Sequence, residues 1–118
     1  MTTKEIGDFG EEMACRYLED NDYEILHRNY KIKLGEVDII AKDNEYTVFI
    51  EVKTRRNNRF ANASEYVDYR KIQHIKNTAL SYIGSSDTAV RFDVIEVYYT
   101  HEGDKLKVKS LNHIKDAF

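Results

Sequence analysis

Two carboxylates and a lysine stand in neighbouring segments, where they can act together on a phosphate ester. Asp38 lies in the run Gly-Glu-Val-Asp-Ile-Ile-Ala at residues 35–41, and the run Phe-Ile-Glu-Val-Lys-Thr at residues 49–54 contains Glu51 and Lys53. Side chains alternate between the two faces of a β-strand, so Glu51 and Lys53 share one face. Carboxylate oxygens suit Mg²⁺ or Mn²⁺, which can activate water and offset phosphate charge. The ammonium of Lys53 can stabilise charge that develops on the phosphate.

The turn between the two runs sets how they pair. If Lys42 pairs with Thr47, the same register places Asp38 opposite Glu51, and Glu36 then faces the lysine of the second run. Like charges directly opposite each other repel, so two carboxylates held this close call for a cation. The alternative is a solvated sheet face of mixed charge, which is common in antiparallel sheets.

A carboxylate on an N-terminal helix can join this site. Apolar residues fall on one arc of a helix over residues 6–18, and Glu11 lies at the margin of that arc, where it can reach the sheet. The alternative for Glu11 is an ordinary boundary residue. Gly7 and Gly10 are costly inside a helix, and they predict a backbone that must approach something closely.

The elements that must position these residues follow the order α-β-β-β-α-β-β. The predicted strands cover residues 23–31, 36–41, 46–54, 90–99 and 106–108. The second helix has an apolar stripe from Ile72 to Ile83, with Ser64 as its cap and Gly84 at its end. Because no repeat or linker interrupts the 118 residues, we expect residues 1–118 to form one domain.

Basic residues gather after the candidate site. The net charge of −3 argues mildly against a nucleic-acid partner, but residues 53–76 contain seven Lys or Arg and only two Asp or Glu. Arg55, Arg56 and Arg59 follow the strand of the candidate site, and we expect them to bind nucleic-acid phosphates. The alternative is a solvated helix of balanced charge.

Cysteine content and hydropathy bear on the compartment. The one cysteine, Cys15, cannot form an internal disulfide, and no apolar run is long enough to span a membrane. We therefore expect a cytoplasmic protein without a membrane partner, in which Cys15 is buried. Tyr66, Tyr69 and Tyr82 can stack on bases, but their helical spacing is more typical of core residues. The histidine spacing does not favour a zinc site.

Three motifs follow one another along the chain. They are Gly7-x-x-Gly10-Glu11-x-x-Ala14, Gly35-Glu36-Val37-Asp38 and Phe49-Ile50-Glu51-Val52-Lys53-Thr54-Arg55. Together they resemble the PD-(D/E)XK nuclease superfamily. They are more closely similar to the small bacterial YraN-like family, which is considered distantly related to archaeal Holliday-junction resolvases. The similarity extends from about residue 4 to about residue 110, although Val37 stands where the superfamily has its proline.

The resemblance implies a fold and a set of roles. The fold is α/β with a restriction-endonuclease-like core, a mixed central sheet flanked by helices. The resemblance implies that Asp38 and Glu51 hold the metal, that Lys53 supports catalysis, and that Glu11 is an accessory helix carboxylate. Lys71 is similar to a basic position of the family, and we predict that it contacts phosphate. Resolvases of this type act as dimers, so a homodimer is also expected.

These observations predict a Mg²⁺- or Mn²⁺-dependent endonuclease that cleaves DNA, with branched or otherwise structured DNA as the expected substrate. One alternative is a nucleic-acid-binding protein that keeps the nuclease fold and does not cut. Another is a protein-interaction scaffold, which would bind neither metal nor DNA. The intact set of Asp38, Glu51 and Lys53 favours the enzyme, because a binding protein has no need of clustered acids.

Overall fold

The computed structural model describes residues 1–56 and 68–118, which form two helices and five strands. The elements are α1 (Thr3–Asp20), β1 (Glu24–Ile32), β2 (Gly35–Asp43), β3 (Tyr46–Arg55), α2 (Tyr69–Ile83), β4 (Ala89–Glu102) and β5 (Lys105–Ile114). The predicted order α-β-β-β-α-β-β is confirmed. The last two strands are longer than the sequence pattern indicates.

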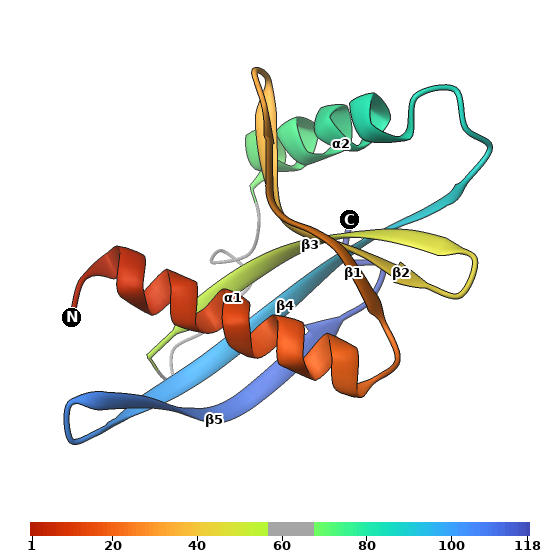
Figure 1. Cartoon of the computed structure of the whole chain (residues 1–118). Helices are drawn as coiled ribbons and strands as arrows, with labels where there is room; N and C mark the ends of the chain where they lie inside the picture. The colour runs from red at the N-terminus through yellow and green to blue at the C-terminus, as the bar shows by residue number, and fades with distance from the viewer. Residues whose placement is uncertain (57–67) are drawn as a thin grey trace.

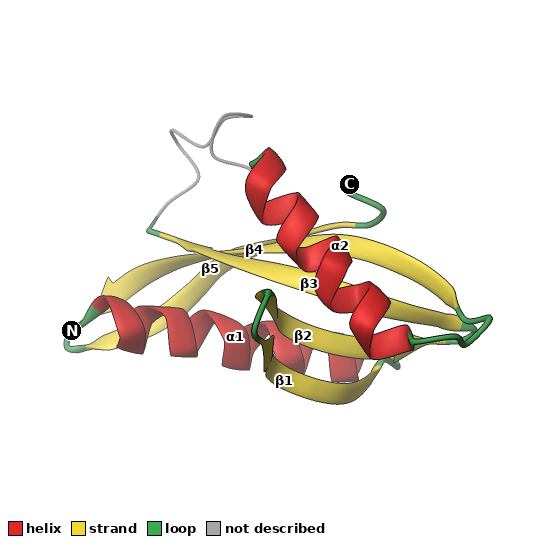
Figure 2. Ribbon diagram, turned by 90° about the horizontal axis from the view of Figure 1, so that it is seen from above, coloured by secondary structure: helices red, strands yellow, loops and turns green. Residues whose placement is uncertain are grey.

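The five strands form one mixed sheet in the order β1-β2-β3-β4-β5. The central pair β3–β4 is parallel, and the other neighbouring strands are antiparallel. Figures 1 and 2 show α1 and α2 on opposite faces of this sheet. A mixed sheet flanked by two helices in this order is consistent with the predicted restriction-endonuclease-like fold.

Helix α1 covers one face through an apolar stripe and begins at a capping box. Thr2 Oγ1 accepts a hydrogen bond from Glu5 N at 3.1 Å, and Glu5 Oε1 accepts one from Thr2 N at 3.1 Å. Ala14 and Leu18 are fully buried in one core cluster with strand residues. Cys15 is also buried there, as expected.

Helix α2 covers the opposite face and begins one turn later than the sequence suggests. Its N-cap is Asp68, whose Oδ1 accepts a hydrogen bond from Lys71 N at 2.9 Å. The predicted cap, Ser64, is therefore wrong, and it lies outside the described residues. Ile75 and Ala79 pack in a second core cluster against the sheet.

The three tyrosines predicted to be core residues have different outcomes. Tyr82 packs its ring against Phe49, with ring centroids 5.9 Å apart, so its core assignment is confirmed. Tyr69 is 76% exposed, and its core assignment is wrong. Tyr66 lies outside the described residues. Across the described ranges, neither helix has the length and hydropathy needed to cross a membrane.

The β1–β2 hairpin leaves the plane of the sheet before it reaches its tip. Lys42 pairs with Thr47 as predicted, but the β2–β3 pairing ends at Ile39–Ile50. Beyond that point the hairpin stands beside α2 (Figure 1). A Cβ atom on Gly35 would lie 2.8 Å from the Thr78 side-chain oxygen, so the hairpin packs directly against the helix. The sheet therefore opens between β2 and β3.

Candidate active site

Glu51 is buried where β2 separates from β3. Its side chain is 6% exposed, and Oε2 accepts no hydrogen bond from the part of the chain that the structure describes. Burial, followed by the neighbouring Asp38 carboxylate, raises the pKa of Glu51 to about 8. Because Glu51 is enclosed, the solvated sheet face considered above does not apply to this residue.

Asp38 faces this opening and replaces part of the missing strand pairing. Its Oδ2 accepts a hydrogen bond from the Val52 backbone N at 2.8 Å. The β2–β3 pairing stops at Ile39–Ile50. Beyond that point the Asp38 carboxylate accepts the Val52 backbone hydrogen bond that a main-chain carbonyl would accept in a continued ladder. The bond fixes Asp38 next to the strand that carries Glu51, so the two predicted carboxylates lie together.

Glu36 is not part of the site, and its predicted position opposite Lys53 is wrong. It is exposed and pairs across the hairpin with Lys31. The physical reason is the bend of the hairpin, which carries residues before Asp38 away from β3 and toward α2. The sequence predicts a continuous antiparallel register for the whole of β2, but the pairing with β3 holds only to Ile39.

Glu11 reaches the site from α1, as expected. Burial and then the charge of Asp38 raise the pKa of Glu11, so the two carboxylates are electrostatically coupled. The close approach predicted for Gly10 is confirmed, because a Cβ atom there would overlap the Thr54 side chain on β3. For Gly7 it stays a prediction, because a Cβ atom there would meet no heavy atom of the described residues within 4 Å.

Lys53 and Arg55 extend the polar row along β3 beyond Glu51. Lys53 is half-buried, and its charge acts on Glu51 to lower the pKa of that carboxyl, against the larger opposing effects of burial and Asp38. Arg55 Nε donates a hydrogen bond to Glu96 Oε2 at 3.2 Å. Glu96 is 1% exposed and also accepts a bond from Asn112 Nδ2 at 2.9 Å. No pattern in the sequence indicated this acid.

The predicted phosphate contacts of the basic residues stay predictions. The guanidinium of Arg55 already bonds to Glu96, so it would have to bind a phosphate in addition to that contact. Arg56 is exposed and can be reached by a phosphate. Arg59 lies outside the described residues. Lys71 is not a free surface cation, because its Nζ forms an ion pair with Glu51 Oε2 at 3.7 Å. The first turn of α2 therefore brings a second lysine to the acids.

The donor set fits a hard cation with few protein ligands. Within residues 1–56 and 68–118, no three His, Cys, Asp or Glu side chains are close enough to share one ion. Mg²⁺ commonly uses one or two carboxylates and completes its coordination with water and substrate phosphates. Asp38 and Glu51 can supply those carboxylates. The enclosed Glu51 Oε2, which lacks a hydrogen-bond donor among the described residues, is a suitable ligand atom.

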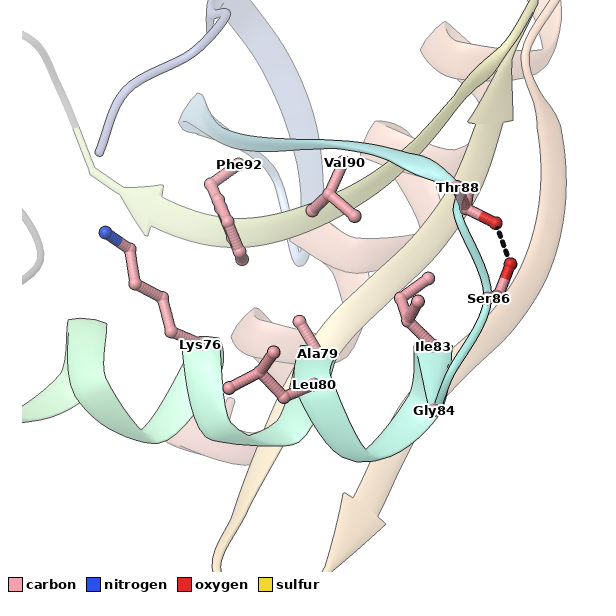
Figure 3. Close-up of a pocket in the computed structure, with 9 residues that line it drawn as sticks. All are labelled: Lys76, Ala79, Leu80, Ile83, Gly84, Ser86, Thr88, Val90 and Phe92. Carbon is pink, nitrogen blue, oxygen red and sulfur yellow. Dashed lines mark hydrogen bonds between the residues drawn. The ribbon is translucent and has the colours of Figure 1, made fainter.

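A cavity lies away from Asp38 and Glu51. It has a volume of about 450 Å³ between the C-terminal half of α2 and the start of β4. Its walls are mostly apolar and include Leu80, Ile83 and Phe92, with Lys76 at one side (Figure 3). None of the predicted site residues lines it, so the acid cluster and this cavity are separate features.

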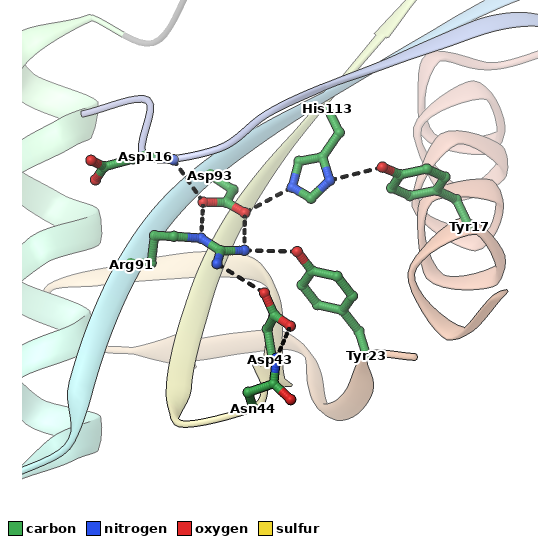
Figure 4. Close-up of polar contacts among 8 residues, drawn as sticks. All are labelled: Tyr17, Tyr23, Asp43, Asn44, Arg91, Asp93, His113 and Asp116. Atoms are coloured by element: carbon green, nitrogen blue, oxygen red, sulfur yellow. Dashed lines mark hydrogen bonds and ion pairs between the residues drawn. The ribbon is translucent and has the colours of Figure 1, made fainter. Parts of the chain in front are cut away.

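A second polar cluster, which no sequence pattern indicated, lies near the turn between β2 and β3 (Figure 4). Arg91 donates hydrogen bonds to both Asp93 oxygens at 2.9 Å, to Asp43 at 2.9 Å and to Tyr23 at 2.7 Å. Asp93 is fully buried and also accepts a bond from His113 Nε2 at 2.7 Å. Although burial alone would raise it, the hydrogen bonds from His113 and Arg91 lower the pKa of Asp93. This cluster connects β2, β4 and β5 with Tyr23, which directly precedes β1.

Comparison with known proteins identifies the family. Residues 10–97 match the model of the uncharacterised protein family UPF0102. The chain belongs to this family. It is 48% identical to a UPF0102 protein of Clostridium beijerinckii over 98% of this chain and 94% of that protein. It is 44% identical to a UPF0102 protein of Caldicellulosiruptor saccharolyticus over the full length of both chains. The resemblance to the YraN-like family is thus confirmed.

The raised pKa of Glu51 predicts how the metal-free UPF0102 protein responds to pH. The folded carboxyl holds its proton up to about pH 8, whereas an unfolded Glu loses it near pH 4.5. Stability therefore falls as pH rises between these values, because folding then keeps a proton that the unfolded chain releases. We expect Glu51→Gln to be more stable than the wild type at about pH 9, on the order of 2 kcal/mol, with little difference at about pH 5.

Urea unfolding in the presence of chelator at both pH values measures this difference. Glu45→Gln is the matched control, since Glu45 is exposed in the β2–β3 turn and should change stability little at either pH. If Glu51→Gln and the wild type lose stability in parallel as pH rises, Glu51 is not protonated in the folded protein.

Proposed function

We propose that this UPF0102 protein is a Mg²⁺- or Mn²⁺-dependent endonuclease that cleaves DNA. The observation that carries the proposal is the burial of Glu51 beside Asp38, with one Glu51 oxygen left without a hydrogen bond from the described residues. Two neighbouring carboxylates in an enclosed position are stabilised by a cation, and Mg²⁺ matches their oxygen donors. We expect the protein to act in the cytoplasm, and a homodimer stays a prediction.

Each residue has a role in this proposal. Asp38 and Glu51 hold the ion, with Asp38 oriented by the Val52 backbone N. When bound, the ion supplies an activated water and offsets the negative charge of the phosphate. Lys53 lies on the same strand face as Glu51 and stabilises the charge that develops on the scissile phosphate. Glu11 acts through Asp38, because their charges are coupled.

A substrate panel tests the proposal. End-labelled linear, single-stranded, flap and four-way-junction DNA are incubated with the purified protein in Mg²⁺, Mn²⁺ or chelator. We expect cleavage of at least one structured substrate with metal and none with chelator. Glu51→Gln and Asp38→Asn should each lower the rate by about 100-fold or more, which is the scale of one positioned charged group. The exposed Glu45→Gln variant should cleave like the wild type.

Calorimetry with Mn²⁺ separates metal binding from catalysis. The wild type should bind, and Asp38→Asn should bind more weakly, because it loses a charged ligand. Equal binding by both proteins, or no binding at millimolar metal, would show that the ion is held elsewhere or not at all. Tight DNA binding without cleavage of any substrate would instead support the non-catalytic binding protein.

A further inference from the structure

A second surface suited to nucleic acid lies between the tip of the β1–β2 hairpin and the facing part of α2. Between them lies a cleft of about 320 Å³. Lysine side chains from both elements line it, namely Lys31, Lys33 and Lys71. Among the described residues that line the cleft, Glu36 is the one carboxylate. A concave surface with this excess of positive charge favours a phosphate backbone.

Lys71 connects this cleft to the candidate active site. It lines the cleft, and its Nζ also lies 3.7 Å from Glu51 Oε2. A nucleic-acid strand whose phosphate lies at the Asp38–Glu51 pair therefore has further phosphates within reach of the cleft. This continuity favours nucleic acid over a membrane or a protein as the ligand.

Leu34 adds an apolar contact at the tip of the hairpin. Ile32 pairs with Gly35, so Lys33 and Leu34 form the two-residue turn. Neither residue is among those with a positive φ, so the turn does not require Gly, Asn or Asp, and its backbone does not dictate a leucine either. Leu34 is 65% exposed. Exposed leucines between basic residues can enter a base step and unstack it.

The hairpin packs closely against α2 next to its tip. A Cβ atom on Gly35 would lie 2.8 Å from the Thr78 side-chain oxygen and 3.0 Å from the His74 backbone oxygen. Glycine at this position therefore lets the hairpin backbone lie directly against α2. Because this contact restrains the hairpin next to its tip, less conformational entropy is lost when the tip meets a ligand.

We propose that the hairpin tip is a second DNA-contact surface, in which lysines bind the backbone and Leu34 occupies a disrupted base step. This inference rests on the proposed nuclease function and names its substrate class. DNA with a branch point or an unpaired base offers an open step to Leu34, whereas uniform duplex must first be unstacked at a cost of a few kcal/mol. The surface thereby selects branched or distorted DNA.

The test measures binding by fluorescence anisotropy with Ca²⁺ in place of Mg²⁺. The probes are plain duplex and a four-way junction with 2-aminopurine at the branch. We expect Lys31→Ala/Lys33→Ala to weaken binding to both probes by about tenfold and to flatten the duplex salt slope by about two. Leu34→Ser should bind duplex normally, bind the junction several-fold more weakly, and lose the 2-aminopurine signal that reports unstacking.

The matched control is Lys105→Ala/Lys109→Ala, which removes two exposed lysines from β5 at the opposite edge of the sheet. It should bind both probes like the wild type. If the hairpin variants match this control, or if the wild type binds neither probe, the proposed surface is wrong. Junction cleavage by the wild type in Mg²⁺ is scored separately. If the wild type cleaves and the hairpin variants bind like it, only the surface is overturned, and if binding depends on the hairpin but no cleavage occurs, only the nuclease is overturned.

Discussion

The Lys53→Ala variant is expected to fold and bind DNA nearly like the wild type, yet to cleave it about 100-fold more slowly or worse. Lys53 is half-buried on β3 and shares the strand face of Glu51, so its ammonium is placed to stabilise charge on the phosphate. That charge grows in the transition state. Removing the lysine should therefore lower the cleavage rate much more than it lowers substrate affinity.

Single-turnover cleavage in Mn²⁺ and binding in Ca²⁺ measure the two effects. Lys42→Ala is the matched control, because Lys42 is an exposed strand lysine on β2 away from the acids. Circular dichroism checks that both variants fold. An unchanged cleavage rate for Lys53→Ala would remove its catalytic role, and a variant that unfolds would assign Lys53 to the structure of the sheet instead.

The Arg91→Met variant should lose about 3–5 kcal/mol of stability, because it leaves a buried carboxylate without its main partner. Arg91 bonds to both oxygens of Asp93, which is fully buried, and also to Asp43 and Tyr23. The contacts that remain, from His113 Nε2 and from the Asp116 backbone N, cannot replace a bidentate guanidinium. A loss of this size is a large part of the stability of an ordinary domain.

Urea unfolding at neutral pH measures the loss, and Lys4→Met is the matched control. Lys4 Nζ lies 2.7 Å from Asp8 Oδ2, so this ion pair is as short as those of Arg91, but it is exposed. Exposed pairs contribute little, and we expect this variant to unfold like the wild type. Equal effects of the two substitutions would mean that the Arg91 cluster does not stabilise the fold.

Local patterns in the sequence predict most of the fold and the centre of the candidate site. Alternation of side chains places Glu51 and Lys53 on one face, and the pairing of Lys42 with Thr47 follows from the turn. The helical arc of α1 also predicts that Glu11 reaches the sheet, and burial followed by the charge of Asp38 raises the pKa of Glu11 in the folded protein. These features depend on residues that are close in the chain or on a single helix.

Features that depend on distant strands could not be predicted. Glu96 meets Arg55 only because β3 and β4 pair in parallel, and no turn in the sequence sets that register. The bend that moves Glu36 away from Lys53 comes from packing of Gly35 against α2, which alternation cannot reveal. Ser and Asp are equally good N-caps, so propensity alone does not choose Asp68.

The contact between Gly10 and Thr54 makes two distant positions depend on each other during evolution. A Cβ atom at position 10 would overlap the Thr54 side chain, so a larger residue there is compatible with the same helix position only if residue 54 becomes smaller. Otherwise α1 must move away from β3 and take Glu11 with it, away from Asp38. The first substitution at this contact thus alters the candidate active site before a second one can restore it.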